Sequence, residues 1–96
     1  MITLNVFFNV KAESQQDFLT LLNTMVRESN KEAGCNYYQL WQQAGQPLRY
    51  ALIELWDSKE RLAEHQKTPH WIAFNDRVND YLDGQYDEHH YSELAR

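Results

Sequence analysis

The chain has 96 residues, of which 43% are hydrophobic, and a formal net charge of −5. This length predicts one domain, spanning residues 1–96. Folded alone, a chain of this length would bury only about 60–65% of the surface that its unfolded form exposes, so pairing with a second copy would stabilise it. The acidic balance and the scattered Lys and Arg residues argue against nucleic acid or an anionic membrane surface as a partner.

The sequence also argues against a membrane or secreted protein. No apolar run approaches the roughly 20 residues that a membrane span needs. Because the amphipathic pattern begins at Ile2, we expect no signal peptide before it. Cys35 is the single cysteine and cannot form an internal disulfide, which agrees with a reducing compartment. These features predict a cytoplasmic protein.

The N-terminal segment predicts a strand followed by a helix. Apolar and polar side chains alternate from Ile2 to Val10, which is the period of a strand with one apolar face. Ser14 and Asp17 have the spacing of a capping box, and the apolar positions after them recur at helical spacing. We expect this helix to end near Gly34, since glycine commonly follows the last helical turn.

The middle of the chain predicts a hairpin. Residues 35–43 and 48–56 are rich in Tyr, Trp, Leu and Ile, and the short segment 44–47 separates them as a loop. Both faces of these strands are apolar, but helices can cover only one of them. We therefore expect a second subunit to cover the other face, giving a homodimer.

The C-terminal half predicts two short helices and a weak final strand, 86–94. Ser58 is placed as the N-cap of the first helix, and Thr68 followed by Pro69 predicts the start of the second. His65 lies three residues after an apolar position of the first helix. Its side chain is therefore expected on the buried side, near the junction of the two helices.

The resulting element order is βαββααβ, and no linker divides it. This order predicts an α+β fold of ferredoxin-like type, in which an antiparallel four-stranded sheet carries its helices on one side.

The four histidines do not have the spacing expected of a metal site. His65 and His70 are five residues apart across a helix break, whereas a shared helical face needs a spacing of three or four. His89 and His90 are adjacent on a predicted strand and point to opposite faces. The chain also has no glycine-rich phosphate loop and no dinucleotide fingerprint. We therefore expect neither a metal nor a flavin or nicotinamide cofactor. Cys35 has no histidine close in sequence to activate it, so a packing role is expected.

Polar side chains on otherwise apolar faces are better candidates for a site. Asn5, Glu54, His65 and Asn75 could line one cavity, although each also has an ordinary structural explanation. The two asparagines could bridge backbone groups, and Glu54 could pair with a surface cation. For His65 we favour a pocket, because a neutral imidazole can accept or donate one proton at cellular pH. The aromatic residues are expected to be mainly core, with one or two reaching the cavity: Tyr38, Trp41, Trp56, Trp71 and Phe74.

Five short motifs lie on this frame between Ile2 and about Leu82. They are Gly34-Cys35-x-x-Tyr38-x-Leu40, Pro47, Glu54-x-Trp56-x-Ser58, Leu62-x-x-His65 and Thr68-Pro69-His70. Together they resemble the antibiotic biosynthesis monooxygenase (ABM) domain family, in particular its small quinol monooxygenase type and the related autoinducer-2 degrading isomerase. The resemblance implies a homodimer in which two ferredoxin-like sheets face each other as a dimeric α/β barrel, with a pocket between each sheet and its helices.

The resemblance further implies a cofactor-independent monooxygenase that uses dioxygen on a small electron-rich aromatic, a quinol or a phenol. In this interpretation the substrate is deprotonated in an apolar cavity, its anion passes an electron to dioxygen, and the radicals recombine. His65 would be the base or hydrogen-bond partner, and Asn5 would hold a substrate or peroxide oxygen. The residues expected to contact the substrate are Trp56, Trp71, Asn75, Glu54 and Phe74.

Two alternatives remain open. His65 and the Thr68-Pro69-His70 run fit equally well an isomerase of a small phosphorylated hydroxy-dione, the autoinducer-2 degradation type. That chemistry needs a cation for the phosphate, and Lys67 or Arg49 would have to turn inward to supply it. The other alternative is a non-catalytic dimer that binds an aromatic metabolite.

Overall fold

The computed structural model describes residues 1–94, and its elements follow one another in the predicted order. The elements are β1 (Ile2–Asn9), η1 (Ala12–Ser14), α1 (Gln15–Ser29), β2 (Cys35–Gln42), β3 (Arg49–Trp56), α2 (Lys59–His65), α3 (Pro69–Arg77), η2 (Val78–Tyr81) and β4 (Asp87–Ser92), where η marks a 3-10 helix.

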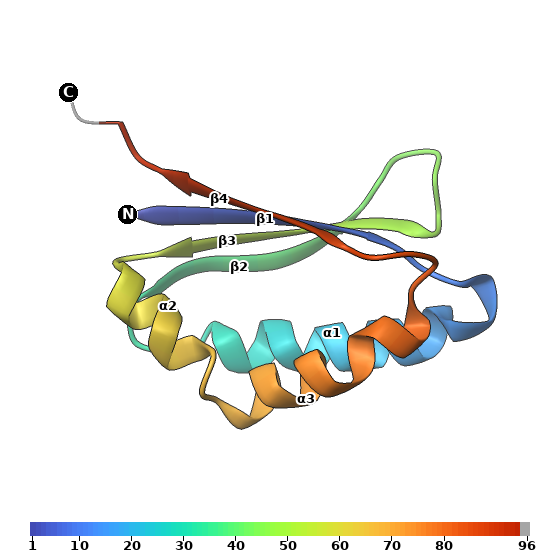
Figure 1. The fold of residues 1–96 in the computed structure, drawn as a ribbon, viewed down its shortest axis with the longest axis horizontal. Helices are drawn as coiled ribbons and strands as arrows, with labels where there is room; N and C mark the ends of the chain where they lie inside the picture. Colours follow the sequence, from blue (N-terminus) through green and yellow to red (C-terminus); the bar gives the residue numbers. More distant parts are fainter. Residues whose placement is uncertain (95–96) are drawn as a thin grey trace.

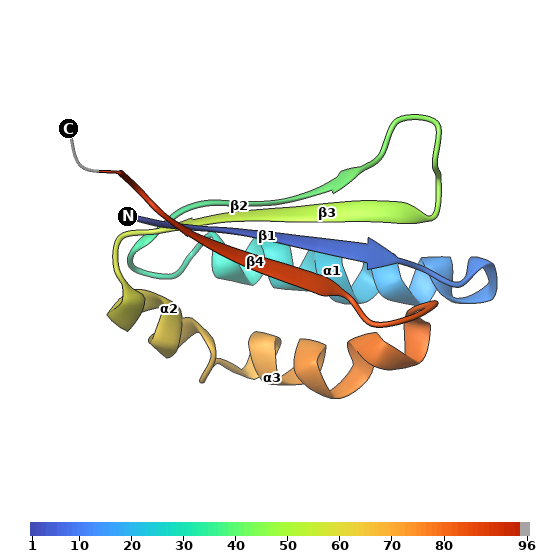
Figure 2. The ribbon, with the colours of Figure 1, turned by 45° about the horizontal axis from the view of Figure 1, so that its top comes forward.

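The four strands form one antiparallel sheet in the order β2-β3-β1-β4. The three α-helices lie on one side of this sheet, and no described helix lies on the other (Figures 1 and 2). This is the predicted α+β ferredoxin-like arrangement, and the prediction is confirmed. The sheet therefore has an inner face, which meets the helices, and an outer face, which does not.

Strand alternation assigns each side chain to one of these faces. Leu4, Val6 and Phe8 of β1 point to the helices and are at most 2% exposed. On α1, Phe18 and Leu22 close the core against them. The outer face consists of Thr3, Asn5 and Phe7 of β1, Ala51, Ile53 and Leu55 of β3, Tyr37, Gln39 and Trp41 of β2, and Asp87, His89 and Tyr91 of β4.

The first helix differs from its prediction at both ends. Ser14 precedes α1 but makes no side-chain cap, because the 3-10 turn η1 leads directly into the helix and leaves Ser14 without the extended backbone that capping requires. The helix ends at Ser29 rather than near Gly34. The Asn30 side-chain amide donates to the carbonyls of Val26 and Tyr38 at 2.8 and 2.9 Å, which ties the helix end to β2.

Both predicted caps of the C-terminal helices are confirmed. The Ser58 hydroxyl accepts from the backbone N–H of Arg61 at 3.2 Å, and the Thr68 hydroxyl accepts from that of Trp71 at 3.3 Å. Pro69 occupies the first turn of α3, where its missing N–H leaves no bond unmade. Only a short turn separates the two helices, so the end of α2 lies next to the start of α3 (Figures 1 and 2).

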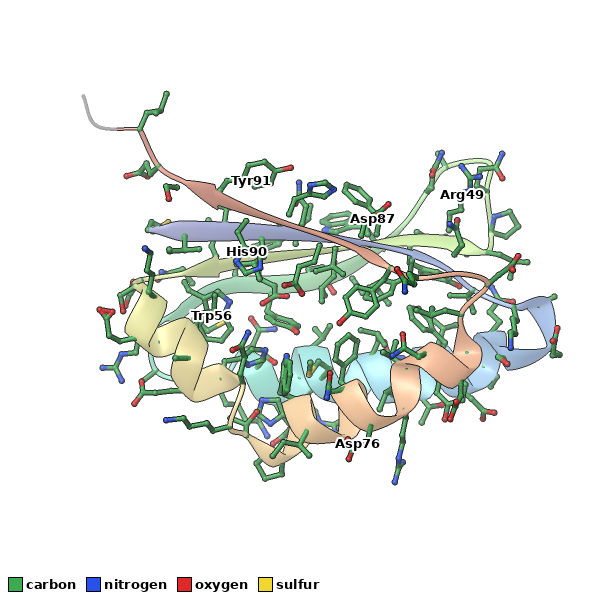
Figure 3. The ribbon with its side chains drawn as sticks, in the orientation of Figure 1. Arg49, Trp56, Asp76, Asp87, His90 and Tyr91 are labelled. Carbon is green, nitrogen blue, oxygen red and sulfur yellow. The ribbon has the colours of Figure 1, made fainter. Side chains whose placement is uncertain are left out.

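The predicted final strand is confirmed as β4, which pairs with β1 at the edge of the sheet. Figure 3 shows His90 on the side of β4 that faces the helices and Tyr91 on the opposite side. All six residues of β4 are exposed, so the helices leave this edge open. Within residues 1–94 no helix is long and apolar enough to cross a membrane.

Candidate functional site

His65 ends α2 with its imidazole inside the protein, where it is 1% exposed. The ring packs against Trp56, with centroids 4.6 Å apart, and against Tyr38, with centroids 5.4 Å apart. Figure 3 shows Trp56 beneath the sheet beside α2. The predicted burial of His65 is confirmed, and the two aromatic rings hold its position.

One carboxylate oxygen joins two histidines. Oε2 of Glu32 lies 2.6 Å from Nδ1 of His65 and 2.7 Å from Nε2 of His70. An ionised carboxylate only accepts hydrogen bonds, so this network assigns a proton to each of those ring nitrogens. Burial lowers the pKa of His65, although the bond to Glu32 opposes the shift, so the ring is neutral at pH 7.

The second ring nitrogen of His65 is free. Nε2 is buried and has no hydrogen-bond partner within residues 1–94. With the proton on Nδ1, this nitrogen carries a lone pair that a hydroxyl group could satisfy. The geometry therefore presents one basic atom, fixed from behind by Glu32.

His65 lies in the wall of a small space that we call the inner cavity. Its volume is about 10 Å³, which is room for about one water molecule. The inner cavity is lined by Leu4, Val6, Met25, Tyr38, Leu52, Glu54, Leu62, His65, Gln66, Trp71, Phe74 and Glu88. Most of these side chains are apolar, but four polar residues, Glu54, His65, Gln66 and Glu88, also line the space.

Glu54 is a second ionisable group in the same wall. It is 4% exposed, and its Oε1 accepts a hydrogen bond from Nε1 of Trp56 at 3.0 Å. Burial raises the pKa of Glu54 to about 7; the Trp56 bond opposes the rise, and the charges of Glu88 and Glu32 add to it. The carboxyl group of Glu54 therefore titrates near neutral pH.

A larger recess of about 330 Å³ opens beside the inner cavity, between α2 and β4. We call it the edge recess; it is lined by Ile2, Lys59, Leu62, Ala63, Gln66, His90, Tyr91 and Ser92. Leu62 and Gln66 line both spaces, so these two side chains form the partition between them. Movement of that partition would connect the edge recess with His65.

The family assignment follows from sequence comparison. The profile of the family described as "Antibiotic biosynthesis monooxygenase" matches residues 1–77. The chain belongs to this family. The resemblance seen in the sequence motifs is therefore confirmed.

Three proteins are similar to the chain, and two of them have solved structures. It is 26% identical over 87 residues to "Putative monooxygenase YcnE" of Bacillus subtilis (strain 168), covering 91% of this chain and 92% of that protein. The solved structure of PA3566 from Pseudomonas aeruginosa is 26% identical, with a TM-score of 0.88 over 98% of this chain and 94% of that one. The solved structure of a protein described as "Putative antibiotic biosynthesis monooxygenase from Nitrosomonas europaea" has a TM-score of 0.92 at 24% identity, covering 99% and 100% of the two chains, and shows the shared fold.

The structure brings several of the predicted site residues of this ABM domain together. Glu54, Trp71 and Phe74 line the inner cavity with His65. Trp56 is fully buried, packs on the His65 ring and bonds Glu54. The alternative that Glu54 pairs with a surface cation is wrong, because its carboxyl group is buried under α2 and α3.

Asn5 and Asn75 lie elsewhere, so the expectation that all four polar residues line one cavity is wrong. Asn5 lies on the outer face, paired in register with Ile53 and His89, on the opposite side of the sheet from His65. Strand alternation requires this, because its neighbours along β1 point to the core. Asn75 is exposed on α3, directly after the buried Phe74.

Sequence reasoning missed Glu32 and misplaced His70. The spacing argument treated His65 and His70 as too far apart to share a site, yet their ring centroids lie 5.7 Å apart across the short turn between α2 and α3. Glu32 lies in the loop between α1 and β2. Pairing of Cys35 with Trp56 brings that loop to the end of the sheet where α2 begins. A prediction of this strand pairing would have pointed to Glu32 as a neighbour of His65.

Cys35 does not contribute a nucleophile. It is partly buried, and burial together with the nearby Glu32 raises the pKa of its thiol to about 11. At neutral pH the group is a thiol, not a thiolate, so it is unreactive. The predicted packing role agrees with this environment.

Proposed function

We propose that the protein is a cofactor-independent monooxygenase that uses dioxygen to oxygenate a small quinol or phenol. The observation that carries this proposal is the state of His65: Nδ1 is held by Glu32, while Nε2 is buried with no partner among residues 1–94, and the residue lines the inner cavity. A base of this kind removes a phenolic proton where water does not compete. Family membership supports the same chemistry.

The proposed reaction begins with proton transfer from the substrate hydroxyl to Nε2 of His65. The imidazolium that forms is stabilised by the Glu32 carboxylate at Nδ1, as in other carboxylate–histidine pairs. The substrate anion then gives one electron to dioxygen, and the two radicals join as a peroxide. Loss of water from that peroxide leaves one oxygen atom on the product, and the substrate supplies all four electrons that reduce dioxygen.

The inner cavity is too small for an aromatic ring, so substrate entry requires movement. We propose that the substrate enters through the edge recess and displaces the partition formed by Leu62 and Gln66. Gln66 is exposed at the end of α2, which leaves its side chain free to move. Trp71 and Phe74 would then pack against the aromatic ring, and Glu54 would face its polar groups.

We further propose a homodimer in which a second copy covers the outer face. Phe7, Trp41 and Tyr91 are 44%, 51% and 47% exposed on that face. Three large aromatic side chains on one helix-free surface form an apolar patch of the kind that marks an interface. A second copy offers the same patch, so an isologous contact would bury both.

Oxygen consumption by chelator-treated protein tests the activity. With 1,4-hydroquinone, methylhydroquinone and 1,4-naphthohydroquinone, we expect uptake above the buffer rate, with one atom of ¹⁸O₂ in the product and the other in water. His65→Gln should lower the rate by about 10²–10⁴-fold. Asp76→Asn, at an exposed position of α3, is the control and should retain the rate.

Three outcomes would count against this proposal. They are uptake no faster than in buffer for every quinol, an undiminished rate in the His65 variant, and stoichiometric hydrogen peroxide without ¹⁸O in the product. A quinol that binds tightly and is recovered unchanged after aerobic incubation would instead support the non-catalytic ligand-binding alternative.

A second candidate is isomerisation of a phosphorylated hydroxy-dione, and Lys59 favours it. This lysine lines the edge recess, where its ammonium could hold a phosphate while His65 moves a proton between carbon atoms. Arg49, considered from the sequence, lines a different hollow near the β2–β3 turn. Lys59→Met should weaken a phosphorylated ligand at least about tenfold. Equal ligand affinity in both proteins would exclude this role.

A further inference from the structure

Three potential metal ligands from three separate elements converge beside His65. Glu32 comes from the loop after α1, His65 from the last turn of α2 and His70 from the first turn of α3. One atom of each, a carboxylate oxygen or a ring nitrogen, lies within 4.8 Å of the other two. Both imidazoles direct a nitrogen at the same oxygen, at 2.6 and 2.7 Å, so their lone-pair directions meet near one point.

We propose that Glu32, His65 and His70 form a binding site for one divalent transition metal ion of the zinc type. Two imidazole nitrogens and one carboxylate are the ligands that such ions select, with bonds of about 2.0–2.2 Å. The ion would lie near the present position of the Glu32 oxygen, and the carboxylate would retreat by about one bond length. Glu32 is in a loop, so its movement does not disturb a helix or strand.

The proposed metal site is closed to solvent at His65 and open to solvent at His70 and Glu32. The His65 side chain is 1% exposed, whereas those of His70 and Glu32 are 12% and 15% exposed. An ion can therefore enter from the side of His70 and Glu32, and solvent on that side can supply the fourth ligand of a tetrahedral ion. The site therefore offers three protein ligands and one open coordination position.

Metal binding would reverse the protonation pattern of His65. In the metal-free protein the proton is on Nδ1, where it is donated to Glu32. A metal at Nδ1 requires the lone pair there, so the proton of the neutral ring moves to Nε2. Nε2 then becomes a donor and can no longer accept a proton. This consequence rests on the proposed function, in which a metal ion would act as an inhibitor.

Binding is measured without reference to activity. Protein is first stripped of metal with a chelator. Its binding of Co²⁺ is then measured by visible absorption, and its binding of Zn²⁺ by calorimetry. We expect one ion per chain and tetrahedral-type Co²⁺ bands. Glu32→Gln, His65→Gln and His70→Gln should each weaken binding at least about tenfold. His89→Gln and His90→Gln remove exposed histidines outside the site and should bind as the unaltered protein does.

Thermal unfolding gives an independent readout that separates lost binding from misfolding. Saturating Zn²⁺ should raise the Tm of the unaltered protein and of the His89 variant, but not that of a folded His70→Gln protein. The proposal is overturned if no ion binds, if Glu32→Gln and His70→Gln retain full affinity, or if affinity is lost with His89 or His90. Failure of quinol oxygenation in metal-free protein leaves these measurements unaffected, so the two proposals are tested separately.

Discussion

Oε2 of Glu32 accepts a hydrogen bond from Nδ1–H of His65, with the two heavy atoms 2.6 Å apart. This bond joins the loop before β2 to the last turn of α2. This bond fixes both the orientation of the imidazole and the nitrogen that carries its proton. It also leaves Nε2 as the buried ring nitrogen without a hydrogen-bond partner among residues 1–94, in a side chain that lines the inner cavity. The relationship between these two residues is therefore the basis of the proposed acid–base chemistry.

Removal of the Glu32 charge should reduce oxygenation while preserving the fold. Glu32→Gln keeps an oxygen that can accept from Nδ1 but no longer stabilises an imidazolium ion, so kcat should fall by about 10²-fold with little change in KM. His70→Gln leaves the Glu32–His65 bond in place and should have a much smaller effect. Steady-state oxygen uptake measures both, and equal losses in the two variants would contradict a specific role for the carboxylate.

The buried carboxyl group of Glu54 should make stability depend on pH. Burial raises its pKa from 4.5 to about 7, so between these values the folded protein holds a proton that the unfolded chain has released. Stability contributed by this group therefore falls as pH rises through that window, by about 3 kcal/mol in total. Glu54→Gln should remove this loss, because the amide can still accept from Trp56 and does not ionise.

Urea denaturation at pH 5 and pH 8 measures this effect as the difference between the variant and the unaltered protein. We expect Glu54→Gln to gain stability relative to the unaltered protein at the higher pH. Glu60→Gln, in the exposed first turn of α2, controls for the loss of one negative charge. A constant difference between variant and unaltered protein at the two pH values would show that Glu54 does not titrate in this range.

Gly34 should be less replaceable than Gly45. Both have positive φ, +85° and +78°, which strains an alanine by about 1–2 kcal/mol. At Gly34 an added Cβ would also clash with Cγ of Arg61, whereas at Gly45 nothing lies within 4 Å. Gly34→Ala should therefore lower the free energy of unfolding by more than Gly45→Ala does. Equal losses by chemical denaturation would mean that Arg61 moves aside freely.

Replacement of Trp41 should weaken the proposed dimer. This side chain is 51% exposed on the outer face, and a charge there would be buried against the second copy. Trp41→Glu should raise the dimer dissociation constant at least about tenfold, as measured by sedimentation equilibrium. Ile72→Glu changes an apolar residue of similar exposure, 46%, on α3 and should leave the dimer dissociation constant unchanged. A monomeric unaltered protein at micromolar concentration would refute the dimer.

Most of the fold was predictable from local patterns. The two-residue alternation of β1, the hairpin strands and the caps at Ser58 and Thr68 each reflect interactions within a few residues, and all of these elements form. The errors also have local causes. Ser14 fails as a side-chain cap because a 3-10 turn precedes it, and α1 stops early because Asn30 bonds to Val26 and to β2.

The sequence by itself determined the element order, the ferredoxin-like sheet and the burial of His65, because periodicity and capping depend on near neighbours in the chain. Only the tertiary structure decided what surrounds that imidazole. Strand pairing carries Glu32 to α2, and the turn between α2 and α3 brings His70 to the same carboxylate. Contacts between residues 33 and 38 positions apart depend on how whole elements pack, and no local spacing encodes them.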